Sequence, residues 1–382
     1  MPETPSRFTA ATLLLVSTLT IMAGAAISPS LPALEAFFSE VPRAGLLVRL
    51  VLTLPALMIA LTAPLAGLLV DRFGRVRLLM ASVLLYALAG VAGGLQDDIF
   101  MLLLTRAALG LGVAGLMTAA TTLITDLYAG DARARMLGLQ ASMMGGGGVI
   151  FLLIGGALSE LGWRYVFATY AAGFLFLPLC ALSLTEPPPR EDGGGDGAAM
   201  PWGPLLGLYA GTAFAQVMFY TVPVQIPFHL KELFGAGGMM IGLTIAVPTV
   251  SFAAASVPYG RVAQRFSRWT LLSLGFLTSG VGLTSLLVAG SYPVIWVGLA
   301  IMGAGFSIMV PTVSNWVSDI APDAARGRAL GGMTTAMFLG QFIAPLISQP
   351  LVEASSIPTM YATLGVTGAA LGLGMLLIGA LR

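Results

Sequence analysis

The sequence predicts an all-α integral membrane protein with twelve transmembrane helices, arranged as two pseudo-symmetric six-helix bundles. Three observations predict this fold: a very apolar composition, twelve long apolar runs, and a repeat that relates the first half of the chain to the second. Hydrophobic residues make up 57% of the chain and charged residues only 9%. A soluble domain carries about 25% charged residues, so the composition excludes an ordinary soluble domain.

The apolar runs are each long enough to cross a bilayer as a helix, for which about 20 residues suffice. Six runs precede the segment TEPPPREDGGGDGAAMPWG, whose proline run, glycines and four acids are typical of a linker, and six follow it. We therefore expect an N-terminal bundle over 1–184, a cytoplasmic linker over 185–203 and a C-terminal bundle over 204–382. The expected helices cover 8–28, 45–69, 77–96, 99–124, 135–158, 164–184, 204–230, 238–260, 269–289, 292–317, 329–352 and 357–381.

A constant spacing of 193 residues relates the two halves. It aligns the segment GLLVDRFGR, which begins at Gly67, with the segment GRVAQRFSR, which begins at Gly260. Charged residues matched at one spacing are not expected by chance in so apolar a chain, and duplicated helical halves are typical of secondary transporters. The same spacing pairs Pro55 with Pro248, Gly110 with Gly303, Asp126 with Asp319, Arg133 with Arg326, Arg135 with Arg328, and Gly138 with Gly331.

Basic residues in the short loops predict the orientation, because Lys and Arg concentrate on the cytoplasmic side. If both termini are cytoplasmic, that side holds 13 of the 18 Lys and Arg residues. We therefore expect a multi-pass protein of the inner cell membrane with both termini in the cytoplasm. The net charge of +1 gives no reason to expect nucleic acid, and one cysteine and one histidine leave no metal cluster, catalytic triad or cofactor site to expect.

Three motifs carry a resemblance to a known family. The segment that begins at Gly67 and continues through Asp71 to Arg75 resembles the signature loop of the major facilitator superfamily, a Gly-x-x-x-Asp-Arg-x-Gly-Arg pattern. The run from Arg106 is similar to that superfamily's Arg-x-x-Gln-Gly motif in helix 4, with Leu109 in place of the Gln, and the PSLP run resembles the proline pair of its drug:proton antiporter branch. The resemblance covers essentially the whole chain and implies the major facilitator fold, with a central cavity and alternating access.

Helix 5 matches the antiporter motif in part. Its spaced glycines agree with the motif, but Phe151 and Leu152 occupy the positions of the motif's Gly-Pro pair, so the bend made by that pair is not expected. The glycines at the motif's spacing are Gly138, Gly147, Gly155 and Gly156.

The resemblance implies that Asp71 faces the start of helix 11 and acts as a gate that closes the cytoplasmic side. A carboxylate near a helix N-terminus is stabilised by about 0.3–1 kcal/mol. The competing interpretation is that the charges here only anchor the topology, but topology gains little from an Asp. The second copy has Gln264 at this position, so we expect an asymmetric gate. The candidate gate residues are Gly67, Asp71, Arg72, Gly74, Arg75, Asp126, Arg133 and Arg135.

Arg106 is the sharpest candidate for a substrate or coupling site, because an intramembrane Arg costs about 2.5–3.5 kcal/mol to insert and needs a cavity or a partner. It would bind an anionic group of the substrate or influence proton coupling as in the resembled family; the alternative is a snorkelling side chain with a packing role. Arg49, nearer a helix end, is interpreted as snorkelling. A titrating role is the alternative for Glu35 at the outer mouth and for His229, but we interpret them as a solvated loop acid and a loop histidine.

Bundles of the resembled family line their path with helices 1, 4, 7 and 10. Polar and aromatic residues on the corresponding segments, interspersed with Met, suit a small amphipathic or hydrophobic molecule. The substrate and coupling candidates are Arg106, Glu35, Gln216, Tyr220, Gln225, Asn315 and Trp316.

Three functional hypotheses follow. The first is proton-coupled export of small amphipathic or hydrophobic molecules by a monomer in contact with membrane lipid. The second is a facilitator or importer of a small organic solute, anionic ones included, without proton antiport; the missing Gly-Pro pair and the lack of a carboxylate deep in a helix favour it. The third, a receptor or a membrane-embedded enzyme, lacks any cluster of catalytic residues in the sequence.

Overall fold

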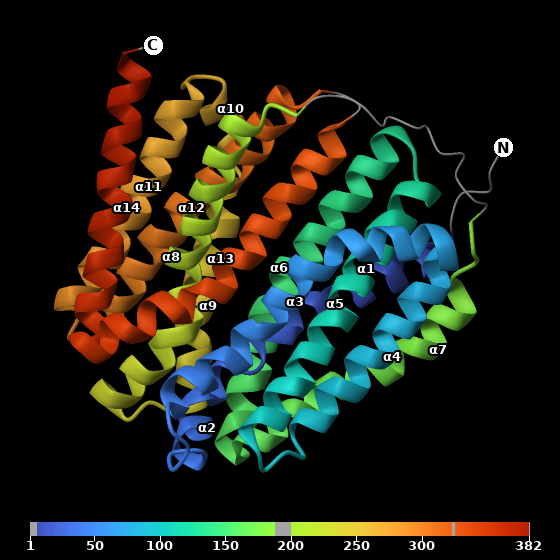
Figure 1. Ribbon diagram of the computed structural model, residues 1–382, viewed down its shortest axis with the longest axis horizontal. Helices are drawn as coiled ribbons and strands as arrows, with labels where there is room; N and C mark the ends of the chain where they lie inside the picture. Colours follow the sequence, from blue (N-terminus) through green and yellow to red (C-terminus); the bar gives the residue numbers. More distant parts are fainter. Residues whose placement is uncertain (1–5, 188–199, 323–324, 382) are drawn as a thin grey trace. The chain divides into compact units, whose positions relative to one another are not determined.

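Helices make up almost all of the computed structural model, which describes residues 6–187, 200–322 and 325–381 (Figure 1). For Pro64, Leu68 and Asp71 it describes the backbone alone. Twelve segments of the described ranges are long and apolar enough to cross a bilayer, which confirms the predicted number of spans. Most of the expected linker, at 188–199, lies outside the described residues.

The chain divides into two compact units. Unit 1 is Met1–Asp192 with Gly237–Gly242, and unit 2 is Gly193–Ala236 with Leu243–Arg382. Unit 1 contains α1 (Arg7–Ala25), the 3-10 helix η1 (Ser28–Ser30), α2 (Leu31–Phe37), α3 (Ala44–Phe73), α4 (Arg75–Gly93), α5 (Ile99–Leu127), α6 (Gly130–Leu161), the 3-10 helix η2 (Trp163–Ala171) and α7 (Ala172–Ser183). Unit 2 contains α8 (Trp202–Phe234), most of α9 (Gly238–Ser256), α10 (Tyr259–Ala263), α11 (Arg268–Thr284), the 3-10 helix η3 (Ser285–Val288), α12 (Tyr292–Ile320), α13 (Arg326–Ala354) and α14 (Ile357–Ala380).

Several helices begin at a residue that caps their first turn. The Asp98 side chain accepts a hydrogen bond of 2.8 Å from the Met101 amide at the start of α5, and the Ser267 hydroxyl accepts one of 3.2 Å from the Thr270 amide at the start of α11. Such caps satisfy amide groups that have no partner within the helix. The polar residues between the apolar runs therefore set where the spans begin.

Some helices extend further than the apolar runs predict. α6 begins at Gly130, where the prediction began at 135, and α8 runs over Trp202–Phe234, where the prediction covered 204–230. Hydropathy marks only the part of a helix that matches the hydrocarbon core, and a helix continues with polar residues beyond it. Several residues expected in loops consequently lie on helices.

Glycine contacts inside each unit follow the repeat. A Cβ on Gly112 in α5 would lie 2.9 Å from the backbone nitrogen of Tyr86 in α4, and one on Gly305 in α12 would lie 2.6 Å from the backbone nitrogen of Ser279 in α11. Tyr86 and Ser279 are themselves separated by 193 residues. Small residues let membrane helices approach closely, so the two units use the same close helix pair.

Candidate functional site

A salt bridge joins α4 and α5 at one end of unit 1. The Arg75 Nε lies 3.1 Å from the Asp126 Oδ2, and the two side chains are only 6% and 8% exposed. Glu186, which follows α7, adds a second interaction: its Oε2 accepts a hydrogen bond of 3.0 Å from the Val76 amide, and its Oε1 accepts one from the Arg75 amide. A carboxylate thus caps the first turn of α4, where the amide groups and the helix dipole favour negative charge.

Gly74 makes this cap possible. It has a φ of +94°, which favours glycine, and a Cβ at this position would lie 2.8 Å from the Glu186 carboxyl carbon. Glu186 could not be predicted as a capping residue, because an acid within a Pro- and Gly-rich linker carries no local sign of its partner.

The second copy of the loop reproduces the salt bridge but not the cap. Arg268 at the start of α11 pairs with Asp319 in α12, one repeat after Arg75 and Asp126. These side chains are 45% and 53% exposed, and the first turn of α11 is capped by the neighbouring Ser267 hydroxyl. The two halves therefore differ in burial and in the group at the helix N-terminus.

The other candidate gate residues are only partly drawn into this cluster. The side chain of Asp71 lies outside the described residues. Arg72 places its guanidinium 5.6 Å from the centre of the neighbouring Phe73 ring, and the Arg133 Nε donates a hydrogen bond of 2.9 Å to the Tyr128 carbonyl. Partial burial raises the pKa of the Tyr128 hydroxyl above its ordinary value, so this residue adds no charge at neutral pH. Arg135 is exposed, and a Cβ on Gly67 would meet open space.

Arg106 is completely buried inside unit 1. Its guanidinium carbon lies 4.8 Å from the centre of the Phe167 ring and 4.9 Å from that of Tyr170, and its Nη2 donates a hydrogen bond of 3.2 Å to the Gly90 carbonyl. The partners predicted for this intramembrane charge are thus two aromatic rings of η2 and a backbone carbonyl of α4. Among the described residues, its Nε and Nη1 have no hydrogen-bond partner, and neither has the buried hydroxyl of Tyr86.

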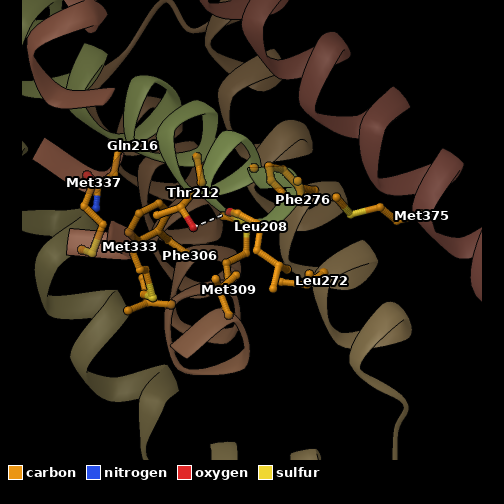
Figure 2. Close-up of a pocket in the computed structure, with 15 residues that line it drawn as sticks. Leu208, Thr212, Gln216, Leu272, Phe276, Phe306, Met309, Met333, Met337 and Met375 are labelled. Atoms are coloured by element: carbon orange, nitrogen blue, oxygen red, sulfur yellow. Dashed lines mark hydrogen bonds between the residues drawn. The ribbon is translucent and has the colours of Figure 1, made fainter. Parts of the chain in front are cut away.

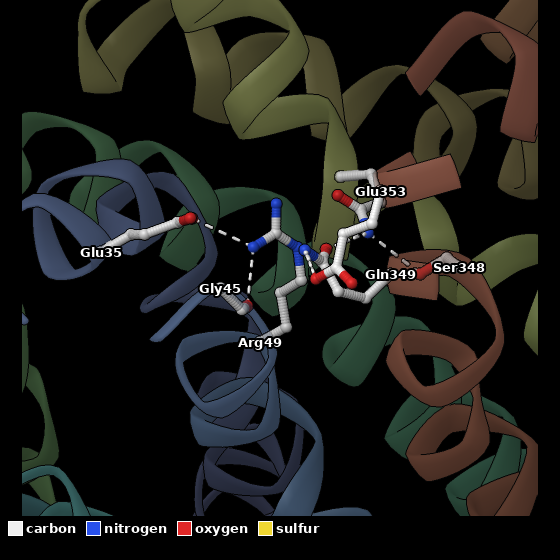
Figure 3. Close-up of polar contacts among 7 residues, drawn as sticks. Glu35, Gly45, Arg49, Ser348, Gln349 and Glu353 are labelled. Atoms are coloured by element: carbon white, nitrogen blue, oxygen red, sulfur yellow. Dashed lines mark hydrogen bonds and ion pairs between the residues drawn. The ribbon is translucent and has the colours of Figure 1, made fainter. Parts of the chain in front are cut away.

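The interpretation of Arg49 as a snorkelling residue is wrong. Its side chain is 4% exposed, and its Nη1 lies 3.0 Å from the Glu35 Oε2 and 2.7 Å from the Gly45 carbonyl oxygen (Figure 3). Glu35 lies in α2, with its side chain 34% exposed. A carboxylate partner and a carbonyl acceptor stabilise the charge inside the protein, and the coupling candidate Glu35 is one half of that ion pair.

The prediction of a loop position for His229 is also wrong, because α8 continues past it. His229 is 2% exposed, and its Nε2 has no hydrogen-bond partner within the part of the chain that the structure describes. One turn before it, the side chain of Gln225 donates a hydrogen bond of 3.0 Å to the Ser348 hydroxyl, and in α13 Gln349 donates one of 3.0 Å to Glu353 (Figure 3). Gln225, a substrate candidate, is therefore part of a network between α8 and α13.

A pocket lies inside unit 2, where α8, α11, α12, α13 and α14 converge (Figure 2). It contains about 430 Å³ of atom-free space, part of it open to the outside, and its lining carries no ionisable side chain. Gln216 is the one predicted substrate candidate among the lining residues. The lining consists of Gly207, Leu208, Gly211, Thr212, Ala215, Gln216, Leu272, Phe276, Phe306, Met309, Val310, Val313, Met333, Met337 and Met375.

The remaining substrate candidates do not line this pocket. Asn315 is exposed and its amide nitrogen lies 3.5 Å from the Tyr259 hydroxyl. Trp316 packs edge-on against Trp269, with 4.9 Å between the ring centres. Tyr220 lies on α8, half-buried. Sequence reasoning missed the pocket walls from α11 and α14, because it considered only the four helices that line the path in the resembled family.

The helix 5 glycines lie on α6, which is unbroken from Gly130 to Leu161 and has no internal proline. A Cβ on Gly147 would lie 3.3 Å from the Thr18 side chain, and one on Gly156 would lie 2.6 Å from the Gly238 carbonyl oxygen. Gly155 packs against the Ala26 carbonyl, whereas a Cβ on Gly138 would meet open space. Gly155 and Gly156 therefore bring α6 close to neighbouring backbones.

Metal-ligating side chains do not gather anywhere in the described residues. No group of three or more His, Cys, Asp or Glu side chains there is arranged to hold a metal ion. The cysteine, Cys180, is buried in α7.

A family model, curated relatives and solved structures each match most of the length of this chain. The family model of the Major Facilitator Superfamily matches residues 13–213 and 208–381. The tetracycline resistance protein, class E, of Escherichia coli is 27% identical over 350 residues, which cover 86% of this chain and 84% of that protein. The quinolone resistance protein NorA of Staphylococcus aureus (strain MRSA252) is 23% identical over 356 residues, covering 88% and 89%. The solved D-xylose–proton symporter has the same fold, with a TM-score of 0.77 at 18% identity over 97% of each chain.

Proposed function

The chain belongs to the Major Facilitator Superfamily, and on that premise we propose that it exports small amphipathic or hydrophobic molecules by alternating access, driven by protons. The pocket in unit 2 carries this proposal. Its walls are Met, Phe, Leu, Val and small residues without an ionisable side chain, and such a lining suits a lipophilic ligand that makes few hydrogen bonds. A sugar needs many more polar partners than this lining offers.

The relatives support export. Two relatives that match most of the chain are named for resistance to tetracycline and to quinolones, and removal of a drug from the cell is one route to resistance that a membrane transporter can provide. Both names refer to compounds built on fused rings. The symporter shares the fold alone at 18% identity, so it carries no argument about direction.

The cluster around Arg75 supports a gate on the cytoplasmic side. It combines a buried ion pair with a carboxylate at a helix N-terminus, and such interactions hold α4, α5 and the segment after α7 in one arrangement. The matching position in unit 2 lacks the carboxylate cap, which supports the asymmetry expected from Gln264. We assign the gate to Gly67, Asp71, Arg72, Gly74, Arg75, Asp126, Arg133 and Arg135 together with Glu186, and both termini to the cytoplasm.

A second candidate function is a facilitator or importer without proton antiport. The observation that favours it is the continuous α6, in which Phe151 and Leu152 stand where the antiporter motif has its Gly-Pro pair. Under this reading substrate moves down its own gradient and the pH gradient is unaffected.

Proton movement in proteoliposomes tests the proposal. The purified protein is reconstituted with an internal pH dye, a pH gradient is imposed, and tetracycline, norfloxacin or the neutral dye N-phenyl-1-naphthylamine is added. Collapse of the gradient that depends on the compound and is absent from protein-free liposomes supports proton-coupled export. Uptake of a compound with an unchanged gradient favours the facilitator. If protein that is demonstrably folded gives neither collapse of the gradient nor uptake of a compound, both functions are contradicted for this panel.

A further inference from the structure

The side-chain amide of Gln216 lies in the pocket without a protein partner. The residue is 4% exposed, yet its side chain makes no hydrogen bond to any described residue. Figure 2 shows it at one end of the pocket, next to Met337. The other polar side chain of the lining, Thr212, already donates a hydrogen bond of 2.8 Å to the Leu208 carbonyl. The lining therefore offers one unpaired amide on an apolar wall.

The other buried glutamines show that this arrangement is specific to Gln216. Gln140 donates a hydrogen bond of 2.9 Å to the Ser17 hydroxyl, Gln225 donates one of 3.0 Å to the Ser348 hydroxyl, and Gln349 donates one of 3.0 Å to Glu353. Buried polar groups are normally paired, and each unpaired group requires an explanation. A ligand that brings its own hydrogen-bonding group supplies one.

We infer that this pocket binds a neutral ring compound with a single hydrogen-bonding group, and that Gln216 recognises that group. The inference rests on the proposed function, because it specifies the substrate class of the same pocket. A charged compound is disfavoured, since the lining has no ionisable side chain to balance its charge. A plain hydrocarbon chain is disfavoured too, because it would leave the Gln216 amide unpaired.

The apolar walls favour a ring over a flexible chain. Phe276 and Phe306 are both nearly completely buried at the pocket, and Met309 and Met333 lie beside them. Methionine sulfur makes favourable contacts with aromatic rings, and its flexible side chain adapts to ligands of different shape. The flexible methionine side chains therefore suit the walls to rings of different size.

Two glycines on α8 open the pocket along one wall. A Cβ on Gly207 or Gly211 would meet open space within 4 Å, although both residues belong to the lining. A large side chain at Gly211 therefore fills the pocket without displacing a neighbouring helix. Gly203, on the same helix, also faces open space but does not line the pocket, and it provides a matched control.

Photolabelling with benzophenone tests the inference on the whole protein in lipid nanodiscs. Benzophenone is a neutral diaryl ketone, and its carbonyl oxygen can accept a hydrogen bond from the Gln216 amide nitrogen. On irradiation the ketone removes a hydrogen atom from a nearby C–H bond, preferentially of methionine, and the two carbon radicals combine. We expect saturable labelling of Met309, Met333, Met337 and Met375, read by mass spectrometry of the digested protein.

The variants separate recognition from general partitioning into lipid. We expect Gln216→Leu to raise the half-saturating benzophenone concentration about tenfold, because the variant loses one hydrogen bond between the ligand and a buried group. Gly211→Phe should abolish the saturable labelling and Gly203→Phe should leave it unchanged. Fluorenone, a neutral ring ketone, should compete, whereas hexadecane and the cation tetraphenylphosphonium should not.

Several results would overturn the inference. One is labelling that does not saturate, and another is labelling of the Gly211→Phe protein equal to that of the unmodified protein. The others are an unchanged half-saturating benzophenone concentration for the Gln216→Leu protein, and competition by hexadecane equal to that by fluorenone. If Gln216→Leu does not fold, the competition series on the unmodified protein decides. Saturable labelling without transport would refute the proposed function alone, and transport of neutral ring compounds without saturable labelling would refute this inference alone.

Discussion

Arg75 and Asp126 form a salt bridge of 3.1 Å in which both side chains are more than nine-tenths buried. Arg268 and Asp319 repeat that pair 193 residues later in an exposed setting. One chain thus contains the same ion pair in two environments, and the energetic effect of burial can be measured without comparing different proteins.

Replacement of one carboxylate in each pair should give unequal losses of stability. Asp126→Asn leaves Arg75 as a buried charge without its counter-ion, and we expect the free energy of unfolding to fall by about 3 kcal/mol. Asp319→Asn should lower it by less than about 1 kcal/mol, because water solvates an exposed arginine. Thermal or denaturant unfolding in detergent measures both, and equal losses would contradict this account of the buried pair.

Removal of the charge of Glu186 should destabilise unit 1. Glu186→Gln keeps an acceptor for one amide of α4 but loses the interaction with the helix dipole, and we expect a loss of about 1 kcal/mol. Glu40→Gln, at an exposed acid, is the control and should have no measurable effect. A melting temperature that is the same for both variants would show that the cap does not contribute to stability.

Arg106 can be replaced by the residue that the repeat supplies. The position 193 residues later holds Leu299, which is completely buried. Arg106→Leu should fold with unchanged or higher stability, since it removes a buried charge with two unpaired nitrogens, but it should abolish transport if the charge takes part in coupling. The melting temperature and the transport rate in proteoliposomes, measured on one preparation, separate the effect on stability from the effect on transport. Normal transport would assign Arg106 to packing alone.

Two glycine pairs of the repeat should respond in opposite ways to alanine. A Cβ on Gly110 would lie 2.8 Å from the Pro55 Cα, and one on Gly303 would lie 2.9 Å from the Pro248 Cα. Gly110→Ala and Gly303→Ala should each reduce the melting temperature and the folded yield. A Cβ on Gly138 or Gly331 meets open space, so alanine there should be neutral or stabilise by up to about 1 kcal/mol. Destabilisation by all four variants would refute the contact argument.

The proposed orientation can be tested with single cysteines. In a Cys180→Ala background, Ala132→Cys at the start of α6 should be reached by a membrane-impermeant maleimide only after the cells are opened. Ser291→Cys, before α12, should react in intact cells; both positions are exposed. The reverse pattern would place both termini outside.

The sequence predicted the twelve spans because hydrocarbon thickness imposes a length that apolar runs reveal directly. It also predicted which residues correspond between the halves, and Arg75–Asp126 and Arg268–Asp319 are indeed equivalent contacts. It misread His229 as a loop residue because the charged residues directly after it, Lys231 and Glu232, mark the end of the apolar run, whereas α8 continues to Phe234. It misread Arg49, because the partner Glu35 lies across a turn that no local pattern marks.

The pocket was predictable only in part. Gln216 was identified from its polarity and its place on the chain, whereas Phe276 and Met375 come from helices whose apolar residues look like ordinary packing in sequence. Convergence of five helices on one space is a property of tertiary packing, and composition along a single helix does not contain it.

The contacts that the two units share, and those that only one of them has, also bear on how the duplicated protein arose. A contact found in both halves, such as Gly112 with Tyr86 and Gly305 with Ser279, is most simply inherited from a half-length ancestor that existed before its gene was duplicated. A contact found once, such as the aromatic enclosure of Arg106, where the other half has Leu299, or the Glu186 cap, was either gained in one half or lost from the other after the duplication. The close helix contacts are thus what the two halves still share, whereas the charged and aromatic groups around Arg106 and Glu186 are what distinguishes them.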